Sequence, residues 1–600
     1  MLTYTMSLVE RVAQLDELCA ALNQAGQGHG RTVLLSGEAG VGKTSLLRAF
    51  TDIAGARARI FEGRCDELQT PRTLGPFRDI ARDRGGALGD ANIDDRDAFI
   101  DALVAEMSFA QRPAVVIVED AHWADHASLD IVRYLARRMS DLPALLLVSY
   151  RDEDLPDEHP LRRVMGSLAG SAVLRMPLTG LSDASVADLA RAAGLDPESV
   201  VDAVGGNPFY LSEVLAEPGA AVPASVRDAV LARVLSLPAP CRAALERLAV
   251  VPTEVETSLL AALVDDPTAL EPAERRGMVT LGYHGLRFRH DIARRVIELS
   301  MSSTRRASAH RRVLTALVKA GAESSRLVHH ALGAGDDQAV ARYAFSAATE
   351  AAHARSHAEA VAFARLVLDR DDTLTDPERA TLHGIAASAL HDLNRFPEAA
   401  AHADEAVAAW DIAGTAPAGA AAAAGMVRAA PAGLAEALLI SARMSTLLAD
   451  PASARAKSVR AVAILTPLGP SRMLALAYST IASRDTLLGE FEDAEAWSER
   501  AVSMATETGS DDVLAHALGY RGVAKATLGD ESGIGDLREA VDAALRLDLA
   551  DYVTVSAHNL SVMLVRSGCL AEAKDYLDIA ERVAAENFLG AARYRIEAQQ

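Results

Sequence analysis

The 600-residue sequence has few cysteines, few aromatic residues and fewer basic than acidic residues. Its four cysteines, Cys19, Cys65, Cys241 and Cys569, are far apart and form no CxxC pair. This spacing disfavours a structural zinc site or a disulfide framework and indicates a reducing cytosol, so we expect a cytoplasmic protein. The formal net charge of −22 would repel a phosphate backbone. Any contact with DNA would therefore need a separate basic module.

Long apolar runs are missing as well. No run of about eighteen apolar residues occurs, and the N-terminal stretch lacks the basic segment and apolar core of a signal peptide. We therefore expect no membrane span. Half of the residues are hydrophobic but only 4% are aromatic, which is typical of a globular, helix-rich chain. The length exceeds what one core can serve, so we expect at least three domains.

Short apolar runs alternate with helical patterns from Arg31 to about Leu178. This alternation predicts a parallel sheet with crossover helices, an α/β domain over residues 1–180. The expected strands are residues 32–36, 58–62, 114–118, 144–150 and 173–178.

A phosphate-binding loop follows the first expected strand. The segment GEAGVGKT fits GxxxxGK[ST] between an apolar strand and a helix, a match that arises by accident on the order of one time in a hundred or less. Its glycines turn backbone N–H groups toward a phosphate, Lys43 neutralises the β- and γ-oxygens, and Thr44 offers a hydroxyl to Mg²⁺. The sequence thus predicts ATP or ADP binding with Mg²⁺. The predicted nucleotide-binding residues here are Gly37, Glu38, Ala39, Gly40, Val41, Gly42, Lys43, Thr44 and Ser45.

Two carboxylates end a second buried strand, PAVVIVED, as in a Walker B strand. A phosphoryl-transfer site requires negative charge beside Mg²⁺ at such a position. Adjacent residues of a strand point to opposite faces, so Glu119 and Asp120 are expected to divide the work. Our hypothesis gives Glu119 the metal shell and Asp120 the attacking water, and the two roles are exchangeable. A solvated strand end is the alternative, which the paired phosphate loop disfavours.

The strand LLLVSY is followed by Arg151. Ligands of parallel sheets lie at the carboxyl ends of strands, so Arg151 is a candidate sensor of the γ-phosphate, although an arginine after a strand is more often only solvated. Two further positions are weaker signals taken alone. The segment GGNPFY, which contains Pro208, fits an ordinary turn, and His290 fits a polar residue of a hairpin.

Helical patterns dominate the rest of the chain. Residues 181–222 read as a helical lid, with Ser182 as a plausible cap. Residues 223–300 read as a winged-helix domain, because helices precede MVTLGYHGLRFRH, whose two apolar runs flank a glycine turn and predict a β-hairpin. Beyond residue 301 nearly everything is amphipathic helix with short loops.

A repeat marks residues 301–600. Gly489, Gly529 and Gly568 recur at spacings of 40 and 39, where glycine supplies a left-handed turn between helices, and Asn394 can play the same part. Five residues, Phe396, Ala399, Ala401, Ala406 and Val407, match Phe491, Ala494, Ala496, Ala501 and Val502 one for one. Small residues let helices approach closely, which predicts an all-α tetratricopeptide-like solenoid. An Ala/Gly/Pro-rich insertion near 413–431 interrupts it.

These motifs together resemble a known family. Val9-Glu10-Arg11, GEAGVGKTS, VIVEDAHWAD, the strand ending SYR, GGNPFY and FRHDIARR occur in the order seen in STAND-class AAA ATPases of the large LuxR-type transcriptional regulators. The resemblance is close over residues 8–300 and generic over the repeats. It implies that Arg11 and Pro208 border the adenine, that Arg151 is the first sensor, and that His290 contacts the β-phosphate of ADP.

The resemblance also implies a switch. ADP would hold a closed monomer, and ATP with an inducer ligand or protein on the repeats would release a self-associating form, with weak ATP hydrolysis as the reset. Two departures stand against it: Gln14 replaces the usual glutamate, and residues 501–600 show no helix-turn-helix. DNA would therefore be reached only through a module not visible in this chain, in a longer regulator or a partner.

Two other classes of function remain open. One is a scaffold ATPase that regulates an attached or partner cyclase or kinase. The other is a mechanochemical AAA+ remodeller, which requires an arginine finger from a neighbouring subunit and a substrate-threading loop. The switch hypothesis explains both halves of the chain, because a solenoid offers a concave capture surface coupled to the nucleotide domain.

Overall fold

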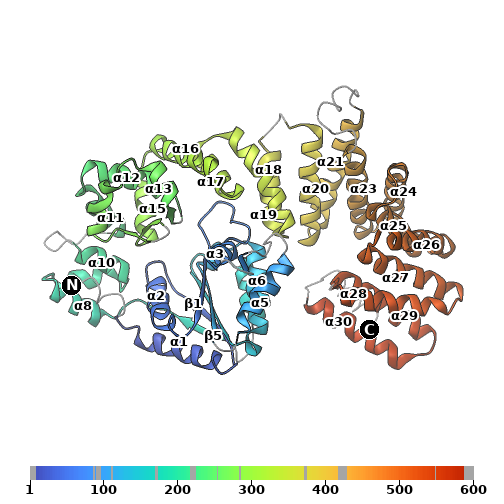
Figure 1. Cartoon of the computed structure of the whole chain (residues 1–600), viewed down its shortest axis with the longest axis horizontal. Helices are drawn as coiled ribbons and strands as arrows, with labels where there is room; N and C mark the ends of the chain where they lie inside the picture. Colours follow the sequence, from blue (N-terminus) through green and yellow to red (C-terminus); the bar gives the residue numbers. More distant parts are fainter. Residues whose placement is uncertain are drawn as a thin grey trace. The chain divides into compact units, whose positions relative to one another are not determined.

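A computed structural model describes residues 9–84, 88–89, 96–109, 112–168, 173–216, 225–252, 254–282, 285–370, 374–415, 429–547 and 549–586. The chain divides into two compact units, residues 1–371 and residues 372–600 (Figure 1). The expected insertion near 413–431 lies largely outside the described residues. Within the described part, no helix has the length and apolar content needed to cross a membrane.

A five-stranded parallel sheet forms the start of the first unit, in the strand order β2-β3-β4-β1-β5. The expected strands are confirmed to within two residues at either end. The elements of this part are α1 (Val12–Ala25), β1 (Arg31–Ser36), α2 (Lys43–Ala54), β2 (Arg59–Arg64), α3 (Gly75–Arg84), α5 (Arg96–Met107), β3 (Ala114–Glu119), η2 (Ala121–Trp123), α6 (His126–Arg138), η3 (Met139–Asp141), β4 (Ala144–Tyr150), α7 (Pro160–Ser167) and β5 (Val173–Pro177).

Helices cover both faces of this sheet, which is why its strands are apolar throughout. Leu34 of β1 packs with β3, β4, α3, α5 and α6 on one face, whereas Val33 and Leu35 pack with α1 and α2 on the other. Successive side chains of a strand alternate between faces, so a strand buried on both sides must be hydrophobic at every position. Both β3 and β4 are buried along their whole length.

Three short helices follow the sheet: α8 (Asp183–Ala192), α9 (Pro197–Val204) and α10 (Pro208–Leu215). Ser182 is the N-cap of α8 and accepts a hydrogen bond from Ser185 N, as expected of a serine at that position. Asn207 caps α10 by accepting from Phe209 N and Tyr210 N, and Pro208 occupies the first helical turn.

A second core joins helices from α10 to α18 and a three-stranded antiparallel sheet of order β6-β8-β7. The predicted hairpin is confirmed, because Val279 pairs with Phe288 and Leu281 with Leu286. The elements are α11 (Val226–Leu235), α12 (Ala239–Ala249), β6 (Val255–Glu256), α13 (Thr257–Leu263), η4 (Pro267–Leu270), α14 (Glu271–Arg275), β7 (Val279–Leu281), β8 (Gly285–Phe288) and α15 (Asp291–Ser300).

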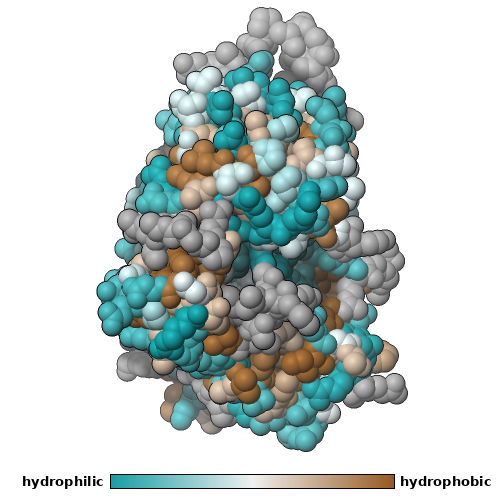
Figure 2. All heavy atoms as spheres, turned by 90° about the vertical axis from the view of Figure 1, so that its left-hand side faces the viewer, coloured by the Kyte–Doolittle hydropathy of each residue, from teal (hydrophilic) through white to brown (hydrophobic). Residues whose placement is uncertain are grey.

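The face of the molecule on the side of these helices is shown in Figure 2, where hydrophobic and hydrophilic residues are interspersed. Among these helices, Leu235 of α11 has 67% of its surface exposed. Single exposed apolar side chains are normal on proteins, so this face alone does not identify an interface.

Four helices complete the first unit, and the remaining helices form the second. In the first unit these are α16 (Ser303–Ala320), α17 (Ser324–Ala334), α18 (Asp337–His353) and α19 (His357–Leu368). In the second they are α20 (Asp376–Asp392), α21 (Phe396–Thr415), α23 (Ala429–Leu447), α24 (Pro451–Leu465), η5 (Thr466–Leu468), α25 (Arg472–Leu488), α26 (Phe491–Thr508), α27 (Asp511–Leu528), α28 (Ser532–Arg546), α29 (Ala550–Arg566) and α30 (Leu570–Glu586). Within each unit, consecutive helices pack against one another as in a solenoid.

The turns of the second unit have the predicted conformation. Gly489, Gly529 and Gly568 have φ values of 83°, 94° and 81°, and Asn394 has a φ of 58°. The matched alanines are only partly interior, because Ala399, Ala406, Ala494 and Ala501 are buried whereas Ala401 and Ala496 are exposed. Close helix approach therefore explains the pairs Ala399/Ala494 and Ala406/Ala501, but not the pair Ala401/Ala496.

Candidate nucleotide-binding site

The loop between β1 and α2 has the backbone of an anion-binding loop. Gly37, Gly40 and Gly42 have φ values of 151°, 80° and 102°, which L side chains rarely adopt. A Cβ on Gly40 would lie 2.9 Å from both Asn207 Oδ1 and Phe209 Cβ. The N-cap of α2, Gly42, supplies no side-chain cap, so the first amides of α2 remain available to a ligand. Ser45 lies in the first turn of this helix.

Lys43 reaches back over this loop. Its Nζ donates to Gly37 O at 2.6 Å and to Glu38 O at 3.0 Å. Burial lowers the pKa of Lys43 to about 8, although the Asp120 carboxylate opposes that shift. A buried ammonium held only by carbonyl oxygens gains strongly from an anion, so this arrangement fits a phosphate group.

Thr44 and Glu119 bring two oxygen ligands together at the strand ends. Thr44 Oγ1 donates to Glu119 Oε2 at 2.9 Å, and Glu119 Oε1 pairs with Arg64 of β2 at 3.1 Å. Glu119 is only 3% exposed. A hydroxyl beside a carboxylate is the oxygen donor set that Mg²⁺ uses with phosphates, so these two residues fit the metal. Arg64 competes for the same carboxylate.

Asp120 lies just beyond the strand, in a different environment from Glu119. Its φ of 54° is left-handed, and its N–H donates to Ser149 Oγ at 3.1 Å. Burial raises the pKa of Asp120 to about 6, and Glu119 adds to that shift while Arg151 opposes it. A carboxylate with a pKa near neutrality suits a general base. The two carboxylates thus differ in partners and in basicity.

Arg151 belongs to the same group. It follows β4, which pairs with β1 so that Ser36 and Tyr150 are in register. The arginine is 9% exposed, and its Nη1 lies 3.4 Å from Asp154 Oδ2. After burial, its charge contributes to the lowered pKa of Lys43, and it opposes the burial that raises the pKa of Asp120, so Arg151 lies near both groups. The carboxyl ends of β1, β3 and β4 thus bring Lys43, Asp120 and Arg151 together.

His290, the N-cap of α15, is partly buried near the phosphate loop. Its ring lies 4.6 Å from the ring of Phe209, whose N–H donates to Gly40 O at 3.3 Å. A Cβ on Gly40 would also meet Ile292 at 3.0 Å, so the start of α15 reaches this loop. Burial, and then the charge of Arg289, lowers the pKa of His290 to about 3. The imidazole is therefore neutral at physiological pH.

Arg11 joins the phosphate loop to the chain after β5. Its Nη2 donates to Thr179 O at 2.6 Å and to Val41 O at 3.3 Å. The preceding Glu10 accepts a hydrogen bond from Ser182 N at 2.9 Å, at the start of α8. Pro208 opens α10, directly after Asn207. The residues that the resemblance assigns to the adenine thus lie on segments that contact the loop.

Three residues of this site were missed by sequence reasoning. Glu153 Oε1 accepts from Ala39 N at 3.0 Å, so a carboxylate occupies a loop amide. Asn207 Nδ2 donates to Ala39 O at 2.9 Å. Arg64 pairs with Glu119, as described above. An asparagine before proline signals a helix cap, but the acidic run after β4 and an arginine ending β2 carry no comparable signal.

Comparison with protein families agrees with a nucleotide-binding domain at the start of the chain. No curated protein matches the chain. A STAND protein with a tetratricopeptide repeat sensor, PH0952 from Pyrococcus horikoshii, is 14% identical with a TM-score of 0.41, covering 96% of this chain and 97% of that one. The apo form of RapI is 10% identical with a TM-score of 0.36, covering 48% and 93%. Residues 7–148 match the family model of the AAA ATPase domain, and the phosphate loop, Glu119 and Asp120 lie within that match.

Proposed function

We propose that this chain is an ATP-dependent signalling switch in the cytoplasm, a LuxR-type regulator whose helical repeats sense an inducer or partner. One observation carries the proposal: the phosphate loop contacts both the sheet and the elements that follow it. Phe209 N–H donates to Gly40 O, and His290 packs on Phe209. A nucleotide on this loop would therefore affect how α10 and α15 pack against the sheet domain.

The loop amides, the start of α2 and Lys43 would hold the phosphates of ATP. Thr44 and Glu119 would hold Mg²⁺, which supplies charge neutralisation of the β- and γ-oxygens. Asp120, partly buried and with a pKa near 6, would take the proton of the attacking water, and Arg151 would contact the γ-phosphate. Glu119 and Asp120 exchange these roles in the alternative assignment. Slow hydrolysis would reset the switch, and Glu153 would leave Ala39 N when phosphate binds.

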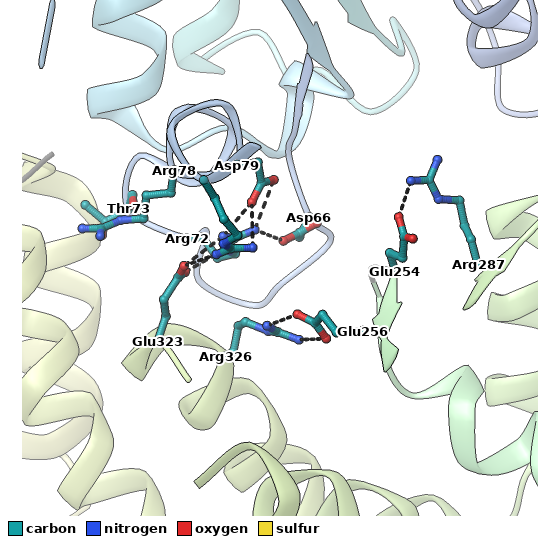
Figure 3. Close-up of polar contacts among 11 residues, drawn as sticks. Asp66, Arg72, Thr73, Arg78, Asp79, Glu254, Glu256, Arg287, Glu323 and Arg326 are labelled. Carbon is teal, nitrogen blue, oxygen red and sulfur yellow. Dashed lines mark hydrogen bonds and ion pairs between the residues drawn. The ribbon is translucent and has the colours of Figure 1, made fainter. Parts of the chain in front are cut away.

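Ionic contacts join the sheet domain to the later helices of the first unit. Arg72, in the loop after β2, pairs with Glu323 at the start of α17 at 2.8 Å and with Asp66 at 3.0 Å (Figure 3). Glu67 of that loop pairs with Arg294 of α15 at 3.2 Å. These contacts describe a closed arrangement, which we assign to the ADP state. ATP together with an inducer would open it and allow self-association.

A second contact lies at the start of α6. Ser356 Oγ donates to Asp125 Oδ2 at 2.9 Å, and His126 Nδ1 lies 3.3 Å from Glu359 Oε1 of α19. Asp125 follows the Walker B segment by a few residues, so a movement at Asp120 would shift the residues that contact Ser356 and α19. This short path supports coupling between the nucleotide and the helical part of the first unit.

The second unit offers a polar and aromatic interior for the inducer. His516 of α27 shares a hydrogen bond of 2.6 Å with Ser479 of α25, and its ring packs against Tyr520 and Tyr552 at 5.0 Å and 4.8 Å. Arg484 lies close enough to lower the pKa of His516, although burial is the larger cause. Such side chains suit a partner with polar groups. DNA would be reached through a module not visible in this chain.

The test replaces His290 with alanine and measures ADP affinity and molecular mass. Loss of a hydrogen bond to a charged group, about 1.5 to 3 kcal/mol, should weaken ADP binding and shift the closed-to-open ratio roughly ten- to hundredfold. Sedimentation with ADP should then show larger species than the parent. His159→Ala is the matched control, because His159 caps α7 at a half-buried position and should affect stability only. Unchanged ADP affinity and unchanged mass in His290→Ala would refute the switch.

A further inference from the structure

Three histidines from two neighbouring helices lie together in the first unit. His310 belongs to α16, and His329 and His330 to α17. One ring nitrogen from each lies within 4.8 Å of the others, and His310 Nδ1 is 3.0 Å from His330 Nδ1. The ring centroids are 5.0 to 5.6 Å apart. Neither the phosphate loop nor its neighbours use these residues.

The cluster is buried and incompletely hydrogen-bonded. His310 and His330 are 4% and 2% exposed, and both ring nitrogens of His329 are shielded from solvent without a hydrogen-bond partner among the described residues. An unsatisfied buried polar group costs about 1–3 kcal/mol, so a ring with two such nitrogens calls for an explanation. Burial lowers the pKa of His329 to about 4 and that of His330 well below its usual range. Burial therefore favours the neutral form of these two rings, which is the form that binds metals.

The surroundings of His310 have the form of a metal ligand's support. Its Nδ1 faces His330, while its Nε2 lies 3.7 Å from Glu298 Oε1 of α15. Metal-bound histidines commonly direct their second ring nitrogen to a carboxylate. Gly333 lies against the same ring, where a Cβ would come within 2.4 Å of it. The absence of a side chain at Gly333 therefore leaves space for the ring of His310.

The distance between His310 Nδ1 and His330 Nδ1 suits zinc. Bonds of about 2.0–2.1 Å in a tetrahedron place ligand nitrogens roughly 3.3 Å apart, close to the 3.0 Å between His310 and His330. His383 and His402 provide an internal comparison, because their Nδ1 atoms are 2.9 Å apart, but the structure groups no third ligand with them among its described residues. A simple pair of hydrogen-bonded imidazoles accounts for that contact, whereas it leaves His329 unexplained.

We propose that His310, His329 and His330 bind a divalent transition metal, with Zn²⁺ as the expected ion, and leave one coordination position open. Three imidazole ligands suit zinc better than Mg²⁺ or Ca²⁺, which prefer oxygen ligands. The ion ties α16 to α17. Because Glu323 immediately before α17 pairs with Arg72, the ion also fixes the helix pair that contacts the sheet domain. The metal site does not depend on the proposed switch.

The test uses the full chain stripped with EDTA and then titrated calorimetrically with ZnCl₂, followed by metal analysis after dialysis. We expect one tightly held Zn²⁺ per chain and, with Co²⁺ instead, the visible absorption of a tetrahedral nitrogen site. His329→Ala should weaken Zn²⁺ binding at least about a hundredfold, and Glu298→Gln about ten- to hundredfold. His383→Ala is the matched control and should bind Zn²⁺ like the parent.

The thermal midpoint and the binding of Zn²⁺ both test the proposal. A raised thermal midpoint with Zn²⁺ but not with Mg²⁺, lost in His329→Ala and kept in His383→Ala, supports the site. Absence of stoichiometric Zn²⁺ in the parent overturns it, as does equal Zn²⁺ affinity in parent and His329→Ala. Should His329→Ala fold poorly, the parent's Co²⁺ spectrum and the effect of Glu298→Gln decide the question.

Discussion

The phosphate-loop edge of the sheet and the contact around Arg72 both bury charge, but they satisfy it differently. At the loop, burial lowers the pKa of Lys43 and raises that of Asp120, so each is held in an environment that disfavours its charged form. Around Arg72, the guanidinium pairs with carboxylates at 2.8 to 3.1 Å (Figure 3). Burial alone would raise the pKa of Glu323, but Arg72 outweighs it and lowers that pKa to about 2.

This difference distinguishes a region that binds a ligand from a region that stabilises a conformation. A buried charge without a full complement gains free energy from a ligand of opposite charge, whereas a charge already paired gains little more. We therefore assign ligand binding to the first region and the holding of a conformation to the second. The following changes test that division.

The largest effect is expected from Lys43→Ala. No other described cation lies on the loop itself, so the variant should lose tight ATP binding, by at least about a hundredfold in Kd. Calorimetric titration with Mg²⁺ and ATP measures this. Lys457→Ala in the second unit, whose Nζ pairs with Asp404 at 3.0 Å, is the control and should bind ATP normally. Binding within a few-fold of the parent in Lys43→Ala would remove the basis of the site assignment.

Next comes the division between the two Walker B carboxylates. Asp120→Asn should keep ATP bound but slow its hydrolysis about 10²- to 10⁴-fold, because the amide has the shape without the basicity. Glu119→Gln should instead raise the Mg²⁺ concentration needed for half-maximal hydrolysis. Single-turnover assays over a range of Mg²⁺ concentrations separate these effects, with Asp152→Asn as an exposed control. Identical behaviour of the Asp120 and Glu119 variants would contradict separate roles.

Arg72→Ala tests the supporting region. Removing one partner of a buried ion pair costs about 3–5 kcal/mol, because the carboxylates left behind are uncompensated. The thermal midpoint of the first unit should fall by about 5 °C or more. Arg82 pairs with the same Glu323 at 3.5 Å but is 59% exposed, so Arg82→Ala should change the midpoint little. Equal shifts in the two variants would show that Arg72 is not a buried support.

The smallest effect is a change in acid sensitivity. Because the folded pKa of Glu323 is lowered from 4.5 to about 2, its contribution is present above pH 4.5 and is lost as pH falls toward 2. Near neutral pH, Glu323→Gln should lower the free energy of unfolding by at most about 3 kcal/mol, and the thermal midpoint should fall with it. Below pH 4.5 the difference from the parent should shrink. Glu398→Gln, in an exposed pair with Arg395, is the control. A difference independent of pH would exclude this ion pair as its cause.

Local patterns made much of the fold and part of the site predictable. Short sequence patterns predict the phosphate loop, the buried strands and the left-handed turns at Gly489 and Gly529, because each depends on residues close in sequence. The position of Arg151 followed from the geometry of parallel strands. Contacts between distant side chains were not predictable, as for Glu153 on Ala39 or Arg72 with Glu323, since no local pattern records them.

The histidine cluster is a second example of a contact that the sequence did not predict. The scattered cysteines argued against a structural zinc site, yet His310 lies one helix away from His329 and His330 and meets them only after α16 and α17 pack. A spacing rule built on cysteine pairs cannot detect ligands from two helices whose relative rotation is set by their packing.

Hydrogen exchange of residues 323–334, the segment that begins at Glu323 and runs through α17, tests the central claim that the nucleotide site controls the supporting contact. The account predicts slow exchange with ADP, faster exchange with Mg²⁺ and ATP plus an inducer, and no nucleotide response in Lys43→Ala, because a ligand shifts an equilibrium only through sites it binds. Asp120→Asn should hold the faster exchange for longer, since it retains ATP. Equal exchange in both nucleotide states of the parent, under conditions where calorimetry shows that each nucleotide is bound, would contradict the account.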